Sequence, residues 1–226
     1  MTVPGLGAIN DIVACEHNRC AYLSDILRNS VYKVALSDAT ATNWPVHDKP
    51  ARLSLTHTYG LLVSCDEVRK IKEFSTDGQL LHVLTLPQDV VSPLHTIQLS
   101  SGQFVVCHGV RSDPLHRVCL IGSDGSVVKS FGRPPGSGSQ CMNVPLHMAV
   151  DRNEFVFVVD VNNRRALLLS PQFTHGREVP REQSQSGPKR VYLDSDRGLL
   201  YVADNEFKDD KCTAGRVVVV KLSACN

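Results

Sequence analysis

A unit that recurs along the chain is the feature that most limits how this sequence can fold. The segment from Pro50 reads PARLSLTHTYGLLVSCD and the segment from Pro188 reads PKRVYLDSDRGLLYVAD; they align without a gap at a proline, an arginine, a Gly-Leu-Leu step and a final aspartate. The segments from Pro93 (PLHTIQLSSGQFVVCH) and Pro145 (PLHMAVDRNEFVFVVD) follow the same plan one residue shorter. A divergent first copy, INDIVACEHNRCAYLSD, begins at Ile9. Such repetition predicts an array of one structural unit.

The five copies end at Asp25, Asp66, His108, Asp160 and Asp204, in steps of 41, 42, 52 and 44 residues. These steps have the length of one supersecondary unit of several short strands. A single unit of this size cannot bury both of its faces, so neighbouring units must cover one another.

Each copy has the same order of apolar runs and turns. A short strand follows the proline, as in Arg52 to Leu55, and a more continuous apolar strand follows it, as in Phe155 to Val159. Asp-Gly steps at Asp77-Gly78 and Asp124-Gly125, a strong hairpin signal, introduce a fourth strand. The third strands are expected at Ser30 to Val34, Arg69 to Phe74, His116 to Ile121, Arg165 to Leu169 and Arg216 to Lys221.

This pattern predicts an all-β fold, a β-propeller of four-stranded antiparallel blades. A parallel fold would need helical crossovers of a dozen or more residues, and the connections are too short and too polar for them. A β-sandwich gives no reason for Pro, Gly and Asp to recur at matching offsets. We expect one domain over residues 1–226, with blades at about 9–46, 50–87, 93–132, 145–180 and 188–222.

The line FVFVVDVNNRRALLLS resembles the NHL repeat, because Asp160, Asn163 and Arg165 are spaced as D-x-x-N-x-R between two apolar strands. The segment from Tyr201 to Val217 is a looser copy, and the second and third copies depart from the motif. The resemblance extends over nearly the whole chain. It implies a six-bladed, TolB-like propeller that serves as a binding platform, in some relatives for RNA and in others for protein or small ligands.

The number of copies differs from that expectation. About five blades of an expected six are visible, and the last copy stops after its third strand, Arg216 to Lys221. An open sheet edge is a feature that proteins normally avoid. We therefore expect a partial six-bladed ring, in preference to a complete five-bladed one.

Two sets of polar residues recur with the repeat. Arg52, His95, His147 and Arg190 each stand two residues after the proline, which is expected to place them around the mouth of the central channel. Arginine and histidine offer hydrogen-bond donors for an anion or a carboxylate. The alternative is that each side chain only bonds to a neighbouring blade's loop.

The second set consists of carboxylates and their neighbours. A group needed once in each blade is more suited to capping a turn than to catalysis. The proposed structural repeat positions are Asp25, Asp66, Asp160, Asn163, Arg165 and Asp204. No catalytic residue, cofactor or metal site is predicted.

Composition narrows the partners and the compartment. With 24 basic and 23 acidic side chains the net charge is +1, so no overall field attracts DNA or anionic lipid. No apolar run approaches the roughly 18 residues of a membrane-spanning helix, and no signal peptide precedes the repeat, which favours a soluble, cytoplasmic protein. Cys15 and Cys20 flank a four-residue turn and could form a disulfide in an oxidising compartment.

The functional expectation is a non-catalytic binding scaffold, not an enzyme, that presents one propeller face to a protein partner. An RNA-binding NHL module is the first alternative, although the near-neutral charge argues against it. A propeller-type lyase or hydrolase with a metal in the central channel is the second.

Overall fold

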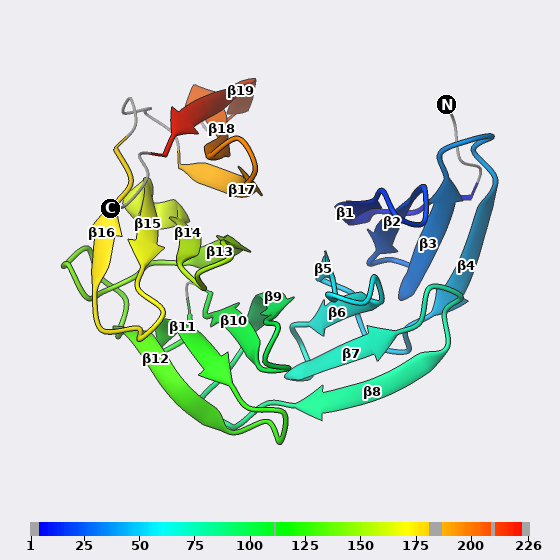
Figure 1. The fold of residues 1–226 in the computed structure, drawn as a ribbon, viewed down its shortest axis with the longest axis horizontal. Coiled ribbons are helices and arrows are strands. Elements are labelled where there is room, and N and C mark those ends of the chain that lie inside the picture. The colour runs from blue at the N-terminus through cyan, green and yellow to red at the C-terminus, as the bar shows by residue number, and fades with distance from the viewer. Residues whose placement is uncertain (1–4, 111, 181–186, 209–210, 223–226) are drawn as a thin grey trace. The chain divides into compact units, whose positions relative to one another are not determined.

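A computed structural model describes residues 5–110, 112–180, 187–208 and 211–222, with the backbone alone at 206–208 and 211–213. Five antiparallel sheets follow one another along the chain, and within each sheet the strands lie side by side in chain order (Figure 1). The first sheet contains β1 (Ile9–Cys15), β2 (Cys20–Asp25), β3 (Ser30–Ala35) and β4 (Ala41–Pro45). The second contains β5 (Arg52–Leu55), β6 (Leu61–Cys65), β7 (Lys70–Phe74) and β8 (Leu80–Thr85).

The later sheets repeat this order. The third contains β9 (Pro93–Gln98), β10 (Phe104–His108), β11 (His116–Ile121) and β12 (Val127–Arg133). The fourth contains β13 (Pro145–Val150), β14 (Val156–Asp160), β15 (Arg165–Leu169) and β16 (Gly176–Glu178), with the 3₁₀ turn η1 (Val161–Asn163) between β14 and β15. The fifth contains β17 (Pro188–Asp194), β18 (Leu199–Lys208) and β19 (Lys211–Lys221).

A sheet of up-and-down strands repeated along the chain is the architecture of β-propeller blades. The predicted all-β propeller class is therefore confirmed, with five blades, four of them four-stranded and the fifth three-stranded in the described part of the chain. The prediction of a single domain stays a prediction.

Local sequence explains the blades. All five residues of β6 are buried, as expected for a central strand covered on both faces. The Asp77-Gly78 turn joins β7 to β8, and Gly78 adopts a left-handed backbone with φ of 85°. A Cβ atom at this position would lie 2.5 Å from a ring carbon of Trp44, so both conformation and space require glycine here.

The chain divides into two compact units, residues 1–106 with 120–128, and residues 107–119 with 129–226. The core of the first unit joins the first two sheets, and Trp44 contacts the rings of both Tyr22 and Phe74 within it. The core of the second unit joins the fourth and fifth sheets. Its buried members are Phe157, Val159, Val161, Ala166, Val179, Val191, Leu200 and Val202.

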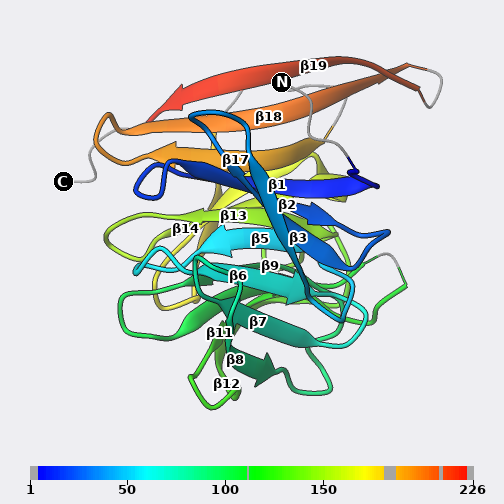
Figure 2. The ribbon, with the colours of Figure 1, turned by 90° about the vertical axis from the view of Figure 1, so that its right-hand side faces the viewer.

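The last hairpin departs from the predicted strand bounds. In the fourth sheet the chain turns directly after Asp160, but Asn205 pairs with Gly215 and the β18–β19 ladder continues to the Lys208–Lys211 pair. Figure 2 shows β17, β18 and β19 side by side, with β19 as the outermost strand of the three. The third strand of this sheet is thus longer than the Arg216 to Lys221 segment expected from the repeat.

Candidate functional site

The first strands of the blades carry the four predicted rim residues. Arg52 begins β5 and His95 lies in β9, and these two strands are in contact within the first unit. His147 lies in β13 and Arg190 in β17, which are in contact within the second unit. The structure therefore places the four residues as two pairs on adjoining strands.

Solvent access separates the two histidines. His95 is only 3% exposed, whereas His147 and Arg190, on the adjoining strand, are partly exposed. A side chain that acts on a ligand must reach it. The pair His147 and Arg190 is therefore the better candidate site.

A β-bulge precedes each of these two residues. In the β13–β14 ladder Pro145 pairs with Asp160 and His147 with Val159, so one extra residue is inserted before His147. The β17–β18 ladder shifts in the same way between Pro188 and Arg190. Bulges redirect the following side chain and are frequent next to active sites.

The first blade has an aspartate in the same position, which the sequence analysis missed. Asp11 follows a bulge in β1, pairs with Ser24, and is 2% exposed. Its Oδ2 accepts the backbone N–H of Leu53 at 2.8 Å and its Oδ1 accepts that of Ile12 at 2.8 Å. The signal was available, because Asp11 precedes Asp25 by the same interval that separates Arg190 from Asp204.

Hydroxyl groups form a buried polar cluster between the second and third blades. The Ser54 hydroxyl donates to the backbone oxygen of Thr96, and the Ser64 and Thr96 hydroxyls lie 2.9 Å apart. These groups are satisfied by one another and are at most 9% exposed. They join adjacent blades and leave little access for a ligand.

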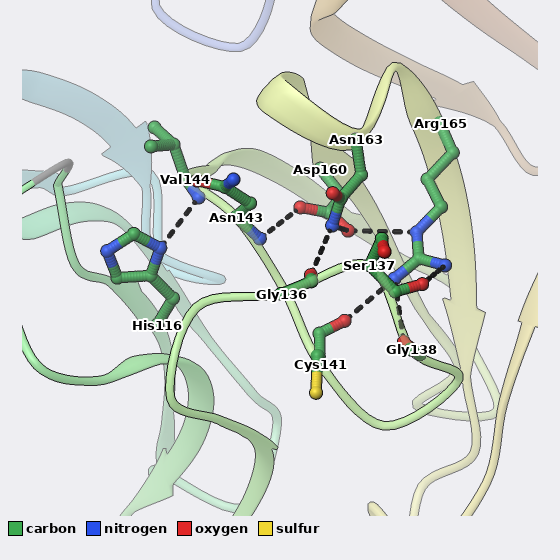
Figure 3. Close-up of polar contacts among 10 residues, drawn as sticks. All are labelled: His116, Gly136, Ser137, Gly138, Cys141, Asn143, Val144, Asp160, Asn163 and Arg165. Carbon is green, nitrogen blue, oxygen red and sulfur yellow. Dashed lines mark hydrogen bonds and ion pairs between the residues drawn. The ribbon is translucent and has the colours of Figure 1, made fainter.

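Around Asp160 the structure forms a network that holds a loop (Figure 3). The carboxylate accepts the backbone N–H of Asn143 at 2.6 Å, Nδ2 of Asn163 at 2.8 Å and Nε of Arg165 at 2.9 Å. Arg165 also donates to the backbone oxygens of Ser137, Gly138 and Cys141. The D-x-x-N-x-R residues therefore bind the loop between β12 and β13.

His116 holds the end of the same loop, as Figure 3 also shows. This side chain is fully buried; its Nδ1 accepts the backbone N–H of Val144 at 3.0 Å and its Nε2 lies 2.7 Å from the oxygen of Val110. Because a backbone N–H can only donate, the imidazole carries its proton on Nε2. His116 thus has a defined tautomer and both ring nitrogens bonded.

The other repeated aspartates differ in their partners. Asp25 is buried and accepts backbone N–H groups from Gly7, Leu27 and Arg28, while Asp204 forms a 3.6 Å ion pair with Arg216. Asp66 lies one residue beyond the equivalent position. Cys65 pairs with Lys70 as Asp160 pairs with Arg165, so the structure shifts the sequence alignment by one residue there.

Two of these carboxyls have pKa values shifted in opposite directions. Burial raises the pKa of Asp160, and the hydrogen bonds from Asn143, Asn163 and Arg165 offset only part of the effect. Burial acts in the same direction at Asp25, but hydrogen bonds from Gly7, Arg28 and Leu27 outweigh it and lower the pKa. Burial and hydrogen bonding therefore balance differently at the same repeat position.

Cys15 and Cys20 face each other across the β1–β2 hairpin, and both thiols are buried and free in this structure. The disulfide stays a prediction. Among the described residues, no three His, Cys, Asp or Glu side chains form a group that could hold a metal ion. No helix in the described part of the chain is long and apolar enough to span a membrane.

Solved structures with the same fold cover nearly all of this chain. A streptogramin B lyase is 14% identical with a TM-score of 0.68, over 98% of this chain and 71% of that one. A catalytically inactive histidine-to-alanine variant of virginiamycin B lyase from Staphylococcus aureus, solved with quinupristin, is 15% identical with a TM-score of 0.65, over 96% and 71%. A nidogen/laminin complex is 16% identical with a TM-score of 0.69, over 92% and 79%.

These likenesses establish the β-propeller fold. No protein-family model and no curated protein matches the sequence, so membership of the NHL family stays a prediction. The predictions of a non-catalytic scaffold and of no enzyme activity are wrong, because lyases stand among the most similar structures and agree better with the lyase or hydrolase alternative.

Proposed function

We propose that this chain is the propeller of a lyase- or hydrolase-type enzyme. In this enzyme His147 acts as the general acid–base, and Arg190 binds the negative charge that develops on the substrate. The observation that carries the proposal is the placement of His147 and Arg190, partly exposed, directly after matching bulges on adjoining first strands. A propeller lyase of this fold becomes catalytically inactive on a single histidine-to-alanine change, which supports a histidine in this role.

The two side chains supply complementary chemistry. Imidazole can accept a proton and return it near neutral pH, and general acid–base catalysis by such a group contributes about 10²- to 10⁴-fold in rate. The guanidinium group offers a planar fork of donors that matches a carboxylate or an oxyanion. In an elimination, His147 takes a proton from carbon, the bond to the leaving carboxylate oxygen breaks, a carbon–carbon double bond forms, and Arg190 stabilises the carboxylate.

The same pair can act on an ester by hydrolysis. His147 then takes a proton from water, which attacks the carbonyl, and returns it to the leaving oxygen. Arg190 stabilises the oxyanion. Both routes act on an ester. With a cyclic ester, the mass of the product distinguishes the two routes.

The experiment incubates the purified chain with quinupristin, virginiamycin B and a panel of simple lactones, followed by mass spectrometry. A ring opened by elimination has the mass of the substrate, whereas a ring opened by hydrolysis gains one water. We expect His147→Ala to lower the rate at least about 100-fold and Arg190→Lys to lower it less, since the charge remains.

Two control variants make the test specific. His82→Ala removes an exposed histidine of β8 and should leave the rate unchanged. His95→Ala removes a buried histidine and should lower the melting temperature before it lowers the rate constant of the folded fraction. Full activity of the His147→Ala variant, or turnover of none of these esters by the wild-type chain, would contradict the proposal.

A further inference from the structure

The outer edge of β19 differs from the third strand of every other blade. In the described part of the chain β19 has β18 on one side and no strand on the other, whereas β3, β7, β11 and β15 each have two neighbours. Two of its valines, Val217 and Val219, are 63% and 52% exposed. An edge strand with free backbone groups is a template for another strand.

The other blades show what normally covers this edge. In the first two blades the second residue of the third strand faces a large apolar residue of the fourth strand: Val31 pairs with Trp44, and the equivalent residue Ile71 pairs with Leu84. Trp44 and Leu84 are 8% and 4% exposed. Each fourth strand thus provides one apolar anchor at this position.

The fourth and fifth blades compare directly, because both lie in the second unit. Ala166 stands opposite Val179, whose N–H donates to the Ala166 oxygen at 2.8 Å, and the two side chains are 0% and 4% exposed. Asp160 pairs with Arg165 and Asp204 with Arg216, so Val217 is the equivalent of Ala166. Ala166 and Val179 are also covered by Val191, Leu200 and Val202 of the fifth sheet. Val217 therefore marks a position that has neither a fourth-strand partner nor a covering sheet among the described residues.

A shallow groove, open to solvent, runs along this edge. It has a volume of about 510 Å³ and is lined by Arg216 to Lys221 together with Pro180. On the neighbouring strand Ala203 pairs with Val217 and Tyr201 with Val219, so a strand placed in the groove continues an apolar surface. The ends of the groove are basic, since Arg216 and Lys221 border it.

The described N-terminal residues are occupied elsewhere, on the first blade. The N–H of Gly7 donates to Asp25, the Tyr32 hydroxyl donates to the oxygen of Gly5, and the N–H of Ile26 donates to the oxygen of Ala8. Residues 5–8 therefore hold the start of the chain against β2 and β3.

We propose that the β19 edge binds an extended segment of a partner protein as an antiparallel fourth strand. The segment carries a large apolar residue opposite Val217, a β-branched residue two positions earlier opposite Val219, and an acidic residue opposite Arg216. Strand addition of this kind draws affinity from backbone hydrogen bonds and specificity from alternate side chains. The proposal is independent of the proposed catalytic pair.

The test uses a fluorescein-labelled peptide with the sequence of residues 40–47, TATNWPVH, which forms a fourth strand within this chain. Fluorescence anisotropy should show saturable binding to the intact 226-residue protein. A peptide with Trp44→Asp should bind at least about tenfold more weakly, which corresponds to about 1.4 kcal/mol. A third peptide, with Pro45→Glu to face Arg216, should bind more tightly than the parent, most clearly at low salt.

Variants of the protein locate the site. Val217→Asp should weaken binding of the parent peptide at least about tenfold. Val219→Lys, a second variant at the same edge, should also weaken it. Val128→Asp is the matched control, because Val128 is a similarly exposed valine, 49%, on the edge strand β12. Circular dichroism should show the same melting temperature for all three variants and the wild type.

Other outcomes would overturn the proposal. Equal binding to the wild type and to both edge variants would place the peptide elsewhere. Light scattering over a range of concentrations tests a second copy of this chain as the occupant. A dimer that Val217→Asp abolishes and that the peptide does not dissociate would show self-association at this edge in place of a partner's strand.

Discussion

Replacing Arg165 by alanine tests the loop network around Asp160 most directly. The Asp160 carboxylate is fully buried and its only cationic hydrogen-bond donor in the network is Nε of Arg165, at 2.9 Å. Removing one partner of a buried ion pair leaves an uncompensated charge and costs about 3–5 kcal/mol. Loss of the 2.7 Å hydrogen bond to the Cys141 oxygen adds about 1 kcal/mol.

Protonation offsets part of this cost. Burial already raises the pKa of Asp160, and loss of the guanidinium raises it further, so the variant takes up a proton more readily in the folded state. A folded-state pKa above the unfolded value gives stability that is present at low pH and lost as the pH rises. We therefore expect Arg165→Ala to lower the free energy of unfolding by about 3 kcal/mol at pH 7 and by less at pH 5.

Urea denaturation followed by circular dichroism measures both values. Arg152→Ala is the matched control, because Arg152 also pairs with an aspartate, Asp196, but the two side chains are 77% and 79% exposed. Exposed ion pairs contribute about 0–1 kcal/mol. If Arg165→Ala and Arg152→Ala differ by less than about 1 kcal/mol at pH 7, the network does not stabilise the fold as described.

Two further substitutions probe the first unit. The pKa of Asp25 is lowered in the folded state, so its ionised carboxylate contributes stability above the unfolded pKa of about 3.9, and this stability is lost as the pH falls through the folded pKa. We therefore expect Asp25→Asn to lower the free energy of unfolding by about 1–3 kcal/mol at pH 7 and by less in acid. A loss that is independent of pH in urea titrations would argue against the hydrogen-bonded carboxylate. Gly78→Ala should destabilise more than Gly102→Ala, because both glycines have positive φ but only at Gly78 would the new Cβ meet the Trp44 ring; equal melting temperatures would count against that contact.

The sequence predicts the blades well because their determinants are local. The Asp-Gly turns, the apolar second strands and the recurring proline each act within a few residues, so Arg52 to Leu55, His116 to Ile121 and Arg165 to Leu169 were predicted with the observed bounds. The extended β18–β19 hairpin was missed because it depends on cross-strand pairs beyond Asp204, where the other copies turn.

The candidate site was only partly predictable. The repeat identifies His147 and Arg190 as equivalent residues, but their exposure depends on packing between blades. The register of the second blade was also not predictable from the sequence alone. The gapless alignment of the repeat places Asp66 with Asp204, and only the pairing of Cys65 with Lys70, equivalent to that of Asp160 with Arg165, shows that the second blade is offset by one residue.

The β-bulge at the start of the first strand in several blades has an evolutionary consequence. The first, fourth and fifth blades each carry one extra residue at this point: Asn10 before Asp11, Leu146 before His147 and Lys189 before Arg190. Because side chains alternate between faces, insertion or deletion of one codon there reverses which residue is presented and leaves the rest of the blade in register. Related propellers could therefore gain or lose an active-site group by a change in length, without any substitution of the group itself.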